Sequence, residues 1–302
     1  MHRPLLAGTY LTSAAAVLFL ALVFLDDREL DGYPLWVKPL KFAVSFAIFF
    51  YTWAWMLSLR HRAGRTSWWM GTALAVSGVA EIGLIAFQAA RAHRSHFNES
   101  TPQDAAIWRL MGLTIAVLLV AQIVAAAALL LERQADRPAT WAVRLGLIVS
   151  TLGIASGALM AFPRPGQNLP DNVAGAHAVG VPDGGAGLPF VGWSTTGGDL
   201  RVPHFIGMHG LQLLPLLAIA LAALAARVAI LRHEQVRARL VLVAGLAYLG
   251  LFALVTWQAL RAQPLLSPDG LTLGVAGVLL MLTLGGVVSS LARPGAPIPQ
   301  NK

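Results

Sequence analysis

The chain has 302 residues, of which 57% are hydrophobic and 12% are charged, and its mean hydropathy is +0.66. Charged residues make up about a quarter of a soluble domain, so this composition excludes one and predicts an integral membrane protein. The formal net charge is +8. A basic protein can bind nucleic acid, but the sequence has no basic run interleaved with aromatic residues and no nucleic-acid-binding motif, so we expect no nucleic-acid partner. Cysteine is absent, which excludes disulfides and thiolate metal ligands.

Hydrophobic runs of about 20 residues recur along the chain, and each is long enough to cross a hydrocarbon core of about 30 Å as a helix. We count eight runs, at 5–25, 42–59, 68–90, 107–131, 145–162, 205–226, 240–260 and 271–291. The first resembles a signal peptide but is too long and lacks a small-residue cleavage site, so we interpret it as a retained span. The predicted fold is all-α, a polytopic transmembrane helix bundle that forms a single domain over 1–292.

The distribution of arginine predicts the orientation of this bundle. If the N-terminus is cytoplasmic, the inner connections "SLRHRAGRTS", "ERQADRPATWAVR" and "RVAILRHEQVRARL" are rich in arginine, and their only acids are Glu132, Asp136 and Glu234. This is the positive-inside pattern. We therefore expect both termini in the cytoplasm of a bacterial inner (plasma) membrane, with membrane lipids as partners of the basic residues and a disordered Pro-rich tail at 293–302.

The connection at 163–203, between the fifth and sixth spans, is predicted to be extracytoplasmic. It is about 40 residues long, and loops longer than about 15 residues without regular structure are usually functional or disordered. Phe190 and Trp193 argue against a fully solvated linker. We expect a folded lid over the outer mouth of the bundle, and we take the outer face as the working face.

Glu81 is the first candidate for chemistry. It lies about nine residues before the outer end of its span, or about 13 Å deep at 1.5 Å per residue. An ionisable group at that depth normally faces the bundle interior and has a partner, although it can be purely structural. Gln88 lies two turns further out on nearly the same stripe, and His96 and Asn98 in the following "SHFN" continue this line at the surface.

The sixth span presents a second polar stripe from the same side. Pro203 suits a first helical turn, His209 follows about 9 Å down the helix, and Gln212 lies one turn deeper, at a depth comparable to that of Glu81. Because the two stripes match in depth, we predict that spans three and six are neighbours. Glu81, Gln88, His209 and Gln212 would then line one pocket, with His96 and His204 above them.

Further residues are predicted to bind substrate. Lys38 and Lys41 are three residues apart on one helix face at the outer boundary, where lysines usually extend into lipid headgroups but also bind an anionic phosphate. Arg201 at the start of the sixth span could hold the same anion. The predicted substrate-binding set is Gln88, Gln212, Arg201, Lys38, Lys41, Asn98 and Trp193.

A metal site is a separate hypothesis. His96, His204, His209 and Glu81 offer imidazole and carboxylate ligands suited to zinc, iron or copper as a divalent metal. The spacing argues against it, because His204 and His209 are five residues apart, about 140° around a helix, unlike the four-residue spacing of a zinc helix. Haem would require a deep histidine pair on facing helices, which is missing, so we expect none.

The motifs "SHFN" and "PHFIGMHGLQLLP" resemble an uncharacterised family of bacterial multi-pass membrane proteins. The resemblance covers most of the chain. It implies a multi-pass membrane fold and brings no reaction, ligand or cofactor with it.

The residues favour an integral membrane enzyme with an outward-opening polar pocket that acts, with metal assistance, on a lipid or other apolar substrate. Glu81 and His209 would be the catalytic residues of a metal-dependent hydrolase or oxidoreductase. One alternative is a proton-coupled small-solute transporter that uses Glu81. The other is an extracytoplasmic sensor or assembly factor, in which protonation of the histidines changes how the loop docks.

Overall fold

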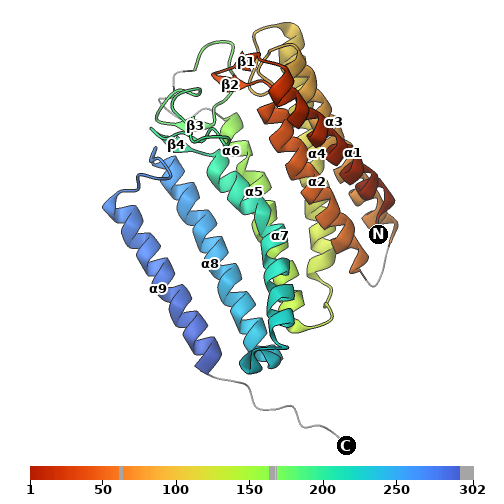
Figure 1. Ribbon diagram of the computed structural model, residues 1–302, viewed down its shortest axis with the longest axis vertical. Coiled ribbons are helices and arrows are strands. Elements are labelled where there is room, and N and C mark those ends of the chain that lie inside the picture. The colour runs from red at the N-terminus through yellow and green to blue at the C-terminus, as the bar shows by residue number, and fades with distance from the viewer. Residues whose placement is uncertain (61–63, 163–166, 168, 293–302) are drawn as a thin grey trace, which may run out of the picture.

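The computed structural model describes residues 1–60, 64–162, 167 and 169–292. The predicted disordered tail at 293–302 and the beginning of the predicted lid at 163 lie outside these residues. Within the described residues, eight helical segments are long and apolar enough to cross a membrane, as the sequence predicts. The protein is a helical bundle of the multi-pass membrane class (Figure 1).

The helices follow the order of the predicted spans. They are α1 (Arg3–Leu25), α2 (Val37–Ser58), α3 (Arg65–Ala90), α4 (Pro102–Leu130), α5 (Arg137–Ser156) with the short α6 (Ala158–Ala161), α7 (Arg201–Leu224), α8 (Glu234–Leu260) and α9 (Gly270–Ala292), and a 3-10 turn at Ala229–Arg232 precedes α8.

Several helices begin four to eight residues before the hydrophobic run that predicts them. The reason is local chemistry that hydropathy does not register. Thr101 accepts a hydrogen bond from the Asp104 amide and Asp136 accepts one from the Ala139 amide, which caps α4 and α5. Proline stands in the first turn of both helices, as it does near the start of α7.

The bundle has two groups of helices. In the first, α1 packs on α2 and α3, and α3 packs on α4; in the second, α5 packs on α7 and α8, and α9 packs on α8. Contacts between α4 and α5 join the groups (Figure 1). The predicted direct packing of spans three and six is wrong, because α3 makes its extensive contacts with α1, α2 and α4, whereas α7 makes them with α5 and α8.

Glycines bring α5 and α7 into close contact. Gly153 of α5 lies against Gly207 and the backbone of Met208 on α7, where an added Cβ would collide with backbone atoms. A Cβ at Gly146 would likewise lie 2.9 Å from the Gly210 carbonyl oxygen. Small residues allow backbones to approach in membranes, where the hydrophobic effect does not drive helices together. This contact fixes the position of α7 on α5.

The longer connections lie at one end of the bundle, which we call the loop end: residues 26–36, 91–101, the described part of 162–200, and 261–269. Here β1 (Glu29–Leu30) pairs with β2 (Tyr33–Pro34), and β3 (Ala178–Val179) pairs with β4 (Gly198–Asp199), both antiparallel. An isolated bridge joins Asn98 to Val173. The segments around His96 and His177 are therefore held together above the helices.

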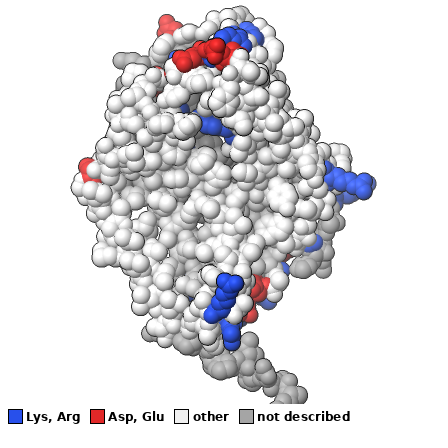
Figure 2. All heavy atoms as spheres, in the orientation of Figure 1, with Lys and Arg blue, Asp and Glu red and all other residues white. Residues whose placement is uncertain are grey.

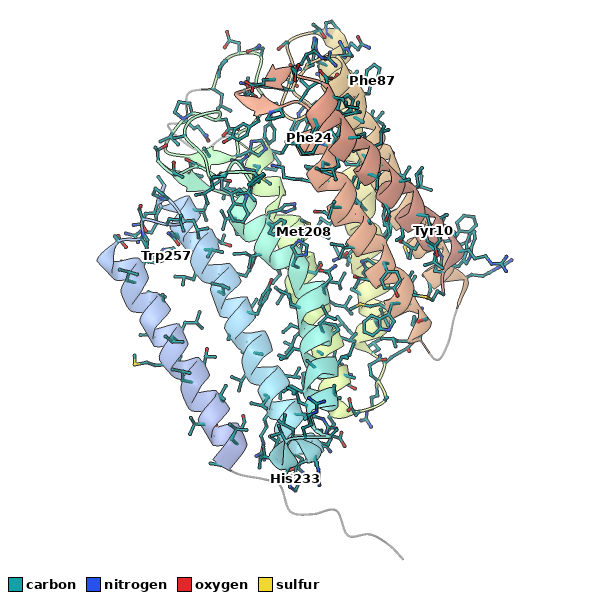
Figure 3. All side chains as sticks on the ribbon, viewed as in Figure 1. Tyr10, Phe24, Phe87, Met208, His233 and Trp257 are labelled. Atoms are coloured by element: carbon teal, nitrogen blue, oxygen red, sulfur yellow. The ribbon has the colours of Figure 1, made fainter. Side chains whose placement is uncertain are left out.

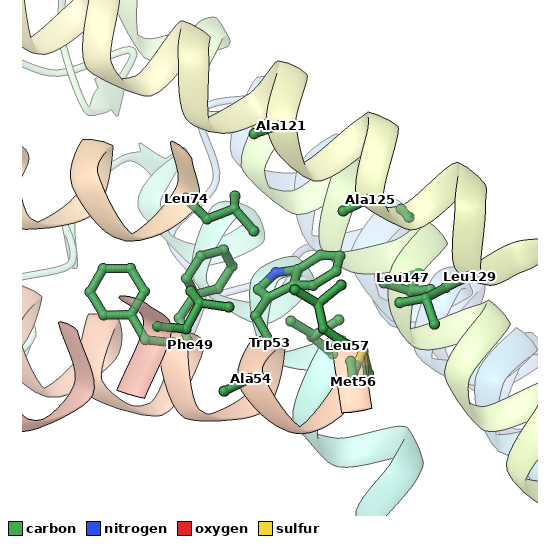
Figure 4. Packing of buried hydrophobic residues seen from close by; sticks show 14 of the residues in the cluster. Phe49, Trp53, Ala54, Met56, Leu57, Leu74, Ala121, Ala125, Leu129 and Leu147 are labelled. Atoms are coloured by element: carbon green, nitrogen blue, oxygen red, sulfur yellow. The ribbon is translucent and has the colours of Figure 1, made fainter. Parts of the chain in front are cut away.

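The largest hydrophobic cluster lies further from the loop end, where α2, α3, α4, α5 and α7 converge (Figure 4). Phe49, Phe50 and Trp53 of α2 pack there against Leu118 and Leu211. On the face shown in Figure 2, charged residues gather at the two ends of the bundle, and most of the surface between them is uncharged. This distribution suits a helix bundle in hydrocarbon.

Candidate functional site

A cavity of about 2330 Å³ opens below the loop end. Residues of α2, α3, α4, α5 and α7 form its walls, and segments 92–98 and 167–194 cover it. Its deeper wall is apolar, with Phe46, Phe49, Leu118 and Met208 among the lining residues. Figure 3 shows Met208 in the space between α7 and α2. Polar and charged groups gather toward the loop end of the cavity.

His177 and Asp183 form a dyad on the wall that the loop contributes. The His177 Nδ1 lies 2.8 Å from Asp183 Oδ2, and the amides of His177 and Ala178 also donate to this carboxylate. These hydrogen bonds outweigh the effect of burial and hold the pKa of Asp183 below its usual range. An ionised carboxylate only accepts, so Nδ1 carries the proton and donates it.

The second nitrogen of His177 is therefore the free one. Its Nε2 has no hydrogen-bond partner among the described residues, and the residue lines the cavity. Burial lowers the pKa of the His177 imidazole, even though Asp183 acts in the opposite direction. A neutral imidazole held by a carboxylate at Nδ1, with an unprotonated Nε2, has the arrangement of a general base.

The positions of the strands explain how this dyad forms. β3 and β4 pair directly after His177 and before α7, and the Leu200 amide donates to the His177 carbonyl at 2.9 Å. Phe97 supports the ring edge to face, with centroids 4.9 Å apart. Sequence reasoning missed both His177 and Asp183. The available signal was a histidine six residues before the aspartate of a "PDGG" turn, which alone is weak.

Glu81 lines the same cavity from α3 and is 1% exposed. The Thr114 hydroxyl of α4 donates to its Oε2 at 2.8 Å. The His96 Nε2 lies 3.8 Å from its Oε1, which is beyond hydrogen-bond distance but within range for an ion pair. The rings of Phe42, Phe97 and Trp108 surround the His96 imidazole. This burial, together with the smaller effect of the Lys38 ammonium, lowers the pKa of His96 well below 6.5.

His204 lies at the start of α7. Its Nδ1 donates to the Gly153 carbonyl at 2.7 Å, a contact that the close packing of α5 and α7 makes possible. His209 lies deeper, with its ring 4.4 Å from that of Phe205. Its buried Nε2 has no hydrogen-bond partner among the described residues, and neither has the buried Oε1 of Gln212. Both residues line the cavity, as the sequence predicts for one pocket, but they lie below the polar groups of the loop end.

The three basic residues predicted to bind substrate line the cavity near its top, as does Arg94, which is paired with Asp31. Arg201 is held by Asp199, through its Nε and Nη2, and by the Gly192 carbonyl. Lys41 donates to the carbonyls of Phe190 and Val191 at 3.0 and 3.2 Å. Lys38 has no hydrogen bond or ion pair with any described residue, although it interacts electrostatically with Glu81. Figure 2 shows Lys or Arg atoms recessed in this face below the loop end. Lys38 and Lys41 thus bring positive charge to the cavity without an ion pair to a described carboxylate.

Two predicted substrate-binding residues are engaged elsewhere. Gln88 does not line the cavity: its amide nitrogen donates to Asp104 Oδ1 at 2.9 Å, and its oxygen accepts from Arg91. Asn98 borders the cavity, but its side chain bonds to the Arg94 carbonyl and the Ser100 amide, which shapes the loop. Trp193 lines the cavity and packs on Phe205, with centroids 5.7 Å apart.

The predicted metal ligands do not converge. In the part of the chain that the structure describes, no group of three or more His, Asp or Glu side chains is placed to hold a metal ion. The Gly153 carbonyl engages one nitrogen of His204, and His209 lies one and a half turns further down α7. The arrangement of donors thus gives the predicted zinc, iron or copper site no support.

A hydrogen-bond network centred on Gln122 lies below the cavity. Gln122, which is fully buried, accepts a hydrogen bond from the Trp53 indole at 3.1 Å and donates to the hydroxyls of Ser150 and Thr151. The apolar cluster of Figure 4 surrounds this network. Among the described residues, the cavity lining extends no deeper than Phe49 of α2, Leu119 of α4 and Gln212 of α7, so it ends above this network.

No family model, curated protein or solved structure matches this chain. The resemblance carried by "SHFN" and "PHFIGMHGLQLLP" therefore adds no function, and the functional argument depends on the site itself.

Proposed function

We propose that the protein is an integral membrane enzyme that performs general acid–base chemistry on a lipid or other apolar substrate in the loop-end cavity. The observation that carries the proposal is the His177–Asp183 dyad. It offers an unprotonated imidazole nitrogen to a cavity whose deeper wall is apolar. A correctly placed proton-transfer group typically contributes about 10²- to 10⁴-fold to a rate.

The residues have separate roles in this proposal. His177 takes a proton from a hydroxyl or water, and Asp183 holds the tautomer that can do so. Glu81, beside His96, is the second proton-transfer group. Lys38, Lys41 and Arg201 hold the anionic part of the substrate. His209 and Gln212 lie along its apolar part. The positive-inside distribution of arginine supports an extracytoplasmic loop end.

The runner-up is a proton-coupled transporter that uses Glu81. A transporter needs access from both sides, and the Gln122 network together with the surrounding apolar cluster closes the cavity below. The enzyme is the better fit for a site without access from the opposite end of the bundle. A sensor would use the same histidines, but it would not need the dyad to present a free nitrogen to the cavity.

The test compares lipid consumption by wild type and His177→Gln. The full chain is placed in nanodiscs made from a bacterial polar lipid extract, and mass spectrometry follows every lipid species over time. We expect wild type to consume at least one species and His177→Gln to slow this by about 10²-fold or more. Asp183→Asn should cause a smaller loss, because the ring keeps its base but not its fixed tautomer.

The matched control is His233→Gln, which changes a histidine at the other end of the bundle, directly before α8 (Figure 3). It should act like wild type. The proposal is overturned if wild type consumes no lipid species, or if His177→Gln is as active as the control. Proton-driven uptake of a solute into vesicles by wild type, abolished in Glu81→Gln, would favour the transporter instead.

A further inference from the structure

We infer that the cavity takes an anionic phospholipid of the adjacent leaflet, whose headgroup lies at Lys38, Lys41 and Arg201 and whose acyl chain passes between α2 and α7. This inference rests on the proposed function and names its substrate class. The passage between the two helices, which we call the side opening, is bordered by Val44 and Ile48 of α2 and by Phe205 and Met208 of α7.

The packing of the helices supports a side opening. α2 packs extensively on α1 and α3, and α7 on α5 and α8, but α2 and α7 are not an extensively packed pair. Val44, Ile48 and Phe205 line the cavity and are 43%, 44% and 41% exposed. Apolar cavity-lining side chains with this much exposure, between two helices that are not extensively packed on each other, are consistent with an opening toward the membrane.

The length of the opening matches one leaflet. A hydrogen bond from Gln212 Nε2 to Thr52 Oγ1, at 3.4 Å, joins the two helices below the opening. From Lys41 to Thr52, α2 advances about 16 Å at 1.5 Å per residue. That is about half of a hydrocarbon core of about 30 Å. An acyl chain with its headgroup at the lysines would thus end near the level of the Gln212–Thr52 contact.

The charges decide which headgroup fits. Lys38 has no hydrogen bond or ion pair with a described residue and interacts with Glu81 and Asp31 only at longer range. Lys41 bonds only to carbonyls. Arg201 is already paired with Asp199, so its charge is largely balanced. The two lysines provide charge for an anion, whereas a zwitterionic headgroup would bring a cation close to them. A phosphate diester of an anionic lipid complements this arrangement.

The chain has no cysteine, so a single introduced cysteine can report occupancy. Met208→Cys places a thiol in the cavity wall, and the full chain is reconstituted in phosphatidylcholine vesicles with or without phosphatidylglycerol. The rate of reaction with N-ethylmaleimide is measured. We expect phosphatidylglycerol to slow labelling by about ten-fold, and Lys38→Gln in the same chain to remove most of that protection.

Leu280→Cys is the matched control, because it lies on the lipid-facing surface of α9 and does not line the cavity. Its labelling should be equal in both vesicles. Ile48→Trp, added to Met208→Cys, should narrow the side opening and reduce protection, whereas Tyr51→Trp, on the outer surface of α2 and outside the cavity lining, should not. Equal labelling of Met208→Cys in the two vesicles would overturn the inference. Protection by inorganic phosphate in vesicles of phosphatidylcholine alone would also overturn it, because the ligand would then be a soluble anion.

This experiment is independent of turnover. His177→Gln should keep full protection, since it leaves the lysines and the side opening intact. If protection occurs but no lipid is consumed, the proposed enzyme fails and the lipid site remains. If a lipid is consumed in a His177-dependent reaction without any protection, the lipid site fails and the enzyme remains.

Discussion

Two buried carboxylates bridge the same pair of helices, and their surroundings differ. Asp104 of α4 accepts hydrogen bonds from Gln88 and Arg91 at the end of α3, and also from Thr101 and His93. Glu81 of α3 accepts one, from Thr114 of α4, and lies beside a cavity. Both are almost fully buried.

The comparison separates a structural group from a candidate functional one. A buried polar group with all its partners stabilises a unique packing, whereas one with unused hydrogen-bonding capacity is available to a ligand. By that criterion Asp104 holds the loop end of α3 on α4. Glu81, with capacity remaining and His96 close by, is the carboxylate that can exchange protons.

Glu81→Gln is the most direct test of the different roles of Glu81 and Asp104. It keeps the shape of the side chain and an acceptor for Thr114 but removes the exchangeable proton. We expect lipid consumption to fall by about 10²-fold with no loss of thermal stability in nanodiscs. A large fall in Tm with unchanged activity per folded molecule would make Glu81 structural and contradict our assignment.

Asp104→Asn should have the opposite profile. The substitution leaves the half-buried Arg91 and His93 facing a neutral amide and removes the charge on which the buried hydrogen-bond network converges. We expect Tm to fall by about 5 °C, with activity per folded molecule close to that of wild type. If the variant were as stable as wild type and inactive, the roles of the two carboxylates would be exchanged.

The stability of the loop end should depend on pH through His96. Burial and then Lys38 place its pKa below 6.5 in the folded chain. The unfolded chain therefore takes up the proton first as the pH falls. Stability is complete above pH 6.5 and is lost as the pH falls from there toward the folded pKa. His177 contributes with the same sign, and Glu81, Lys38 and His204 also face this region.

We expect Tm to decrease between about pH 6.5 and about pH 5, and His96→Gln to reduce the decrease because the substituted side chain does not titrate. Thermal denaturation of both chains across this range measures the difference. Parallel curves for the two chains would show that His96 does not carry the effect.

The smallest change in Tm is expected for the Gln122 network below the cavity. Gln122→Leu removes three hydrogen bonds and leaves the Trp53 indole without its acceptor. Hydrogen bonds between membrane helices average about 0.6 kcal/mol, so we expect Tm to fall by only a few degrees, about 2 to 4 °C. Activity should be unchanged, since the network lies below the cavity. A proton leak across vesicles would instead show that Gln122 seals a pathway.

The sequence alone predicted the class of fold, because eight apolar runs of membrane-spanning length leave no other way to satisfy their backbone groups. It also identified Glu81, Lys38, Lys41, His204 and Arg201, since ionisable residues within or at the ends of spans are costly and therefore conspicuous. These residues do line one cavity. Depth along a helix follows from counting residues, but it did not decide whether the two polar stripes face each other.

Only the tertiary structure decided which helices are neighbours. Depth gives no information on rotation about the bundle axis, and the close glycine contacts place α7 on α5 rather than on α3. Gln88 bonds to Asp104 because α3 packs on α4. The His177–Asp183 dyad was beyond sequence reasoning, because a loop has no period, and its partners are fixed by pairing of β3 with β4 and by bridging to the 91–101 segment. The candidate site is thus built from spans that hydropathy reveals and completed by a loop whose fold depends on long-range contacts.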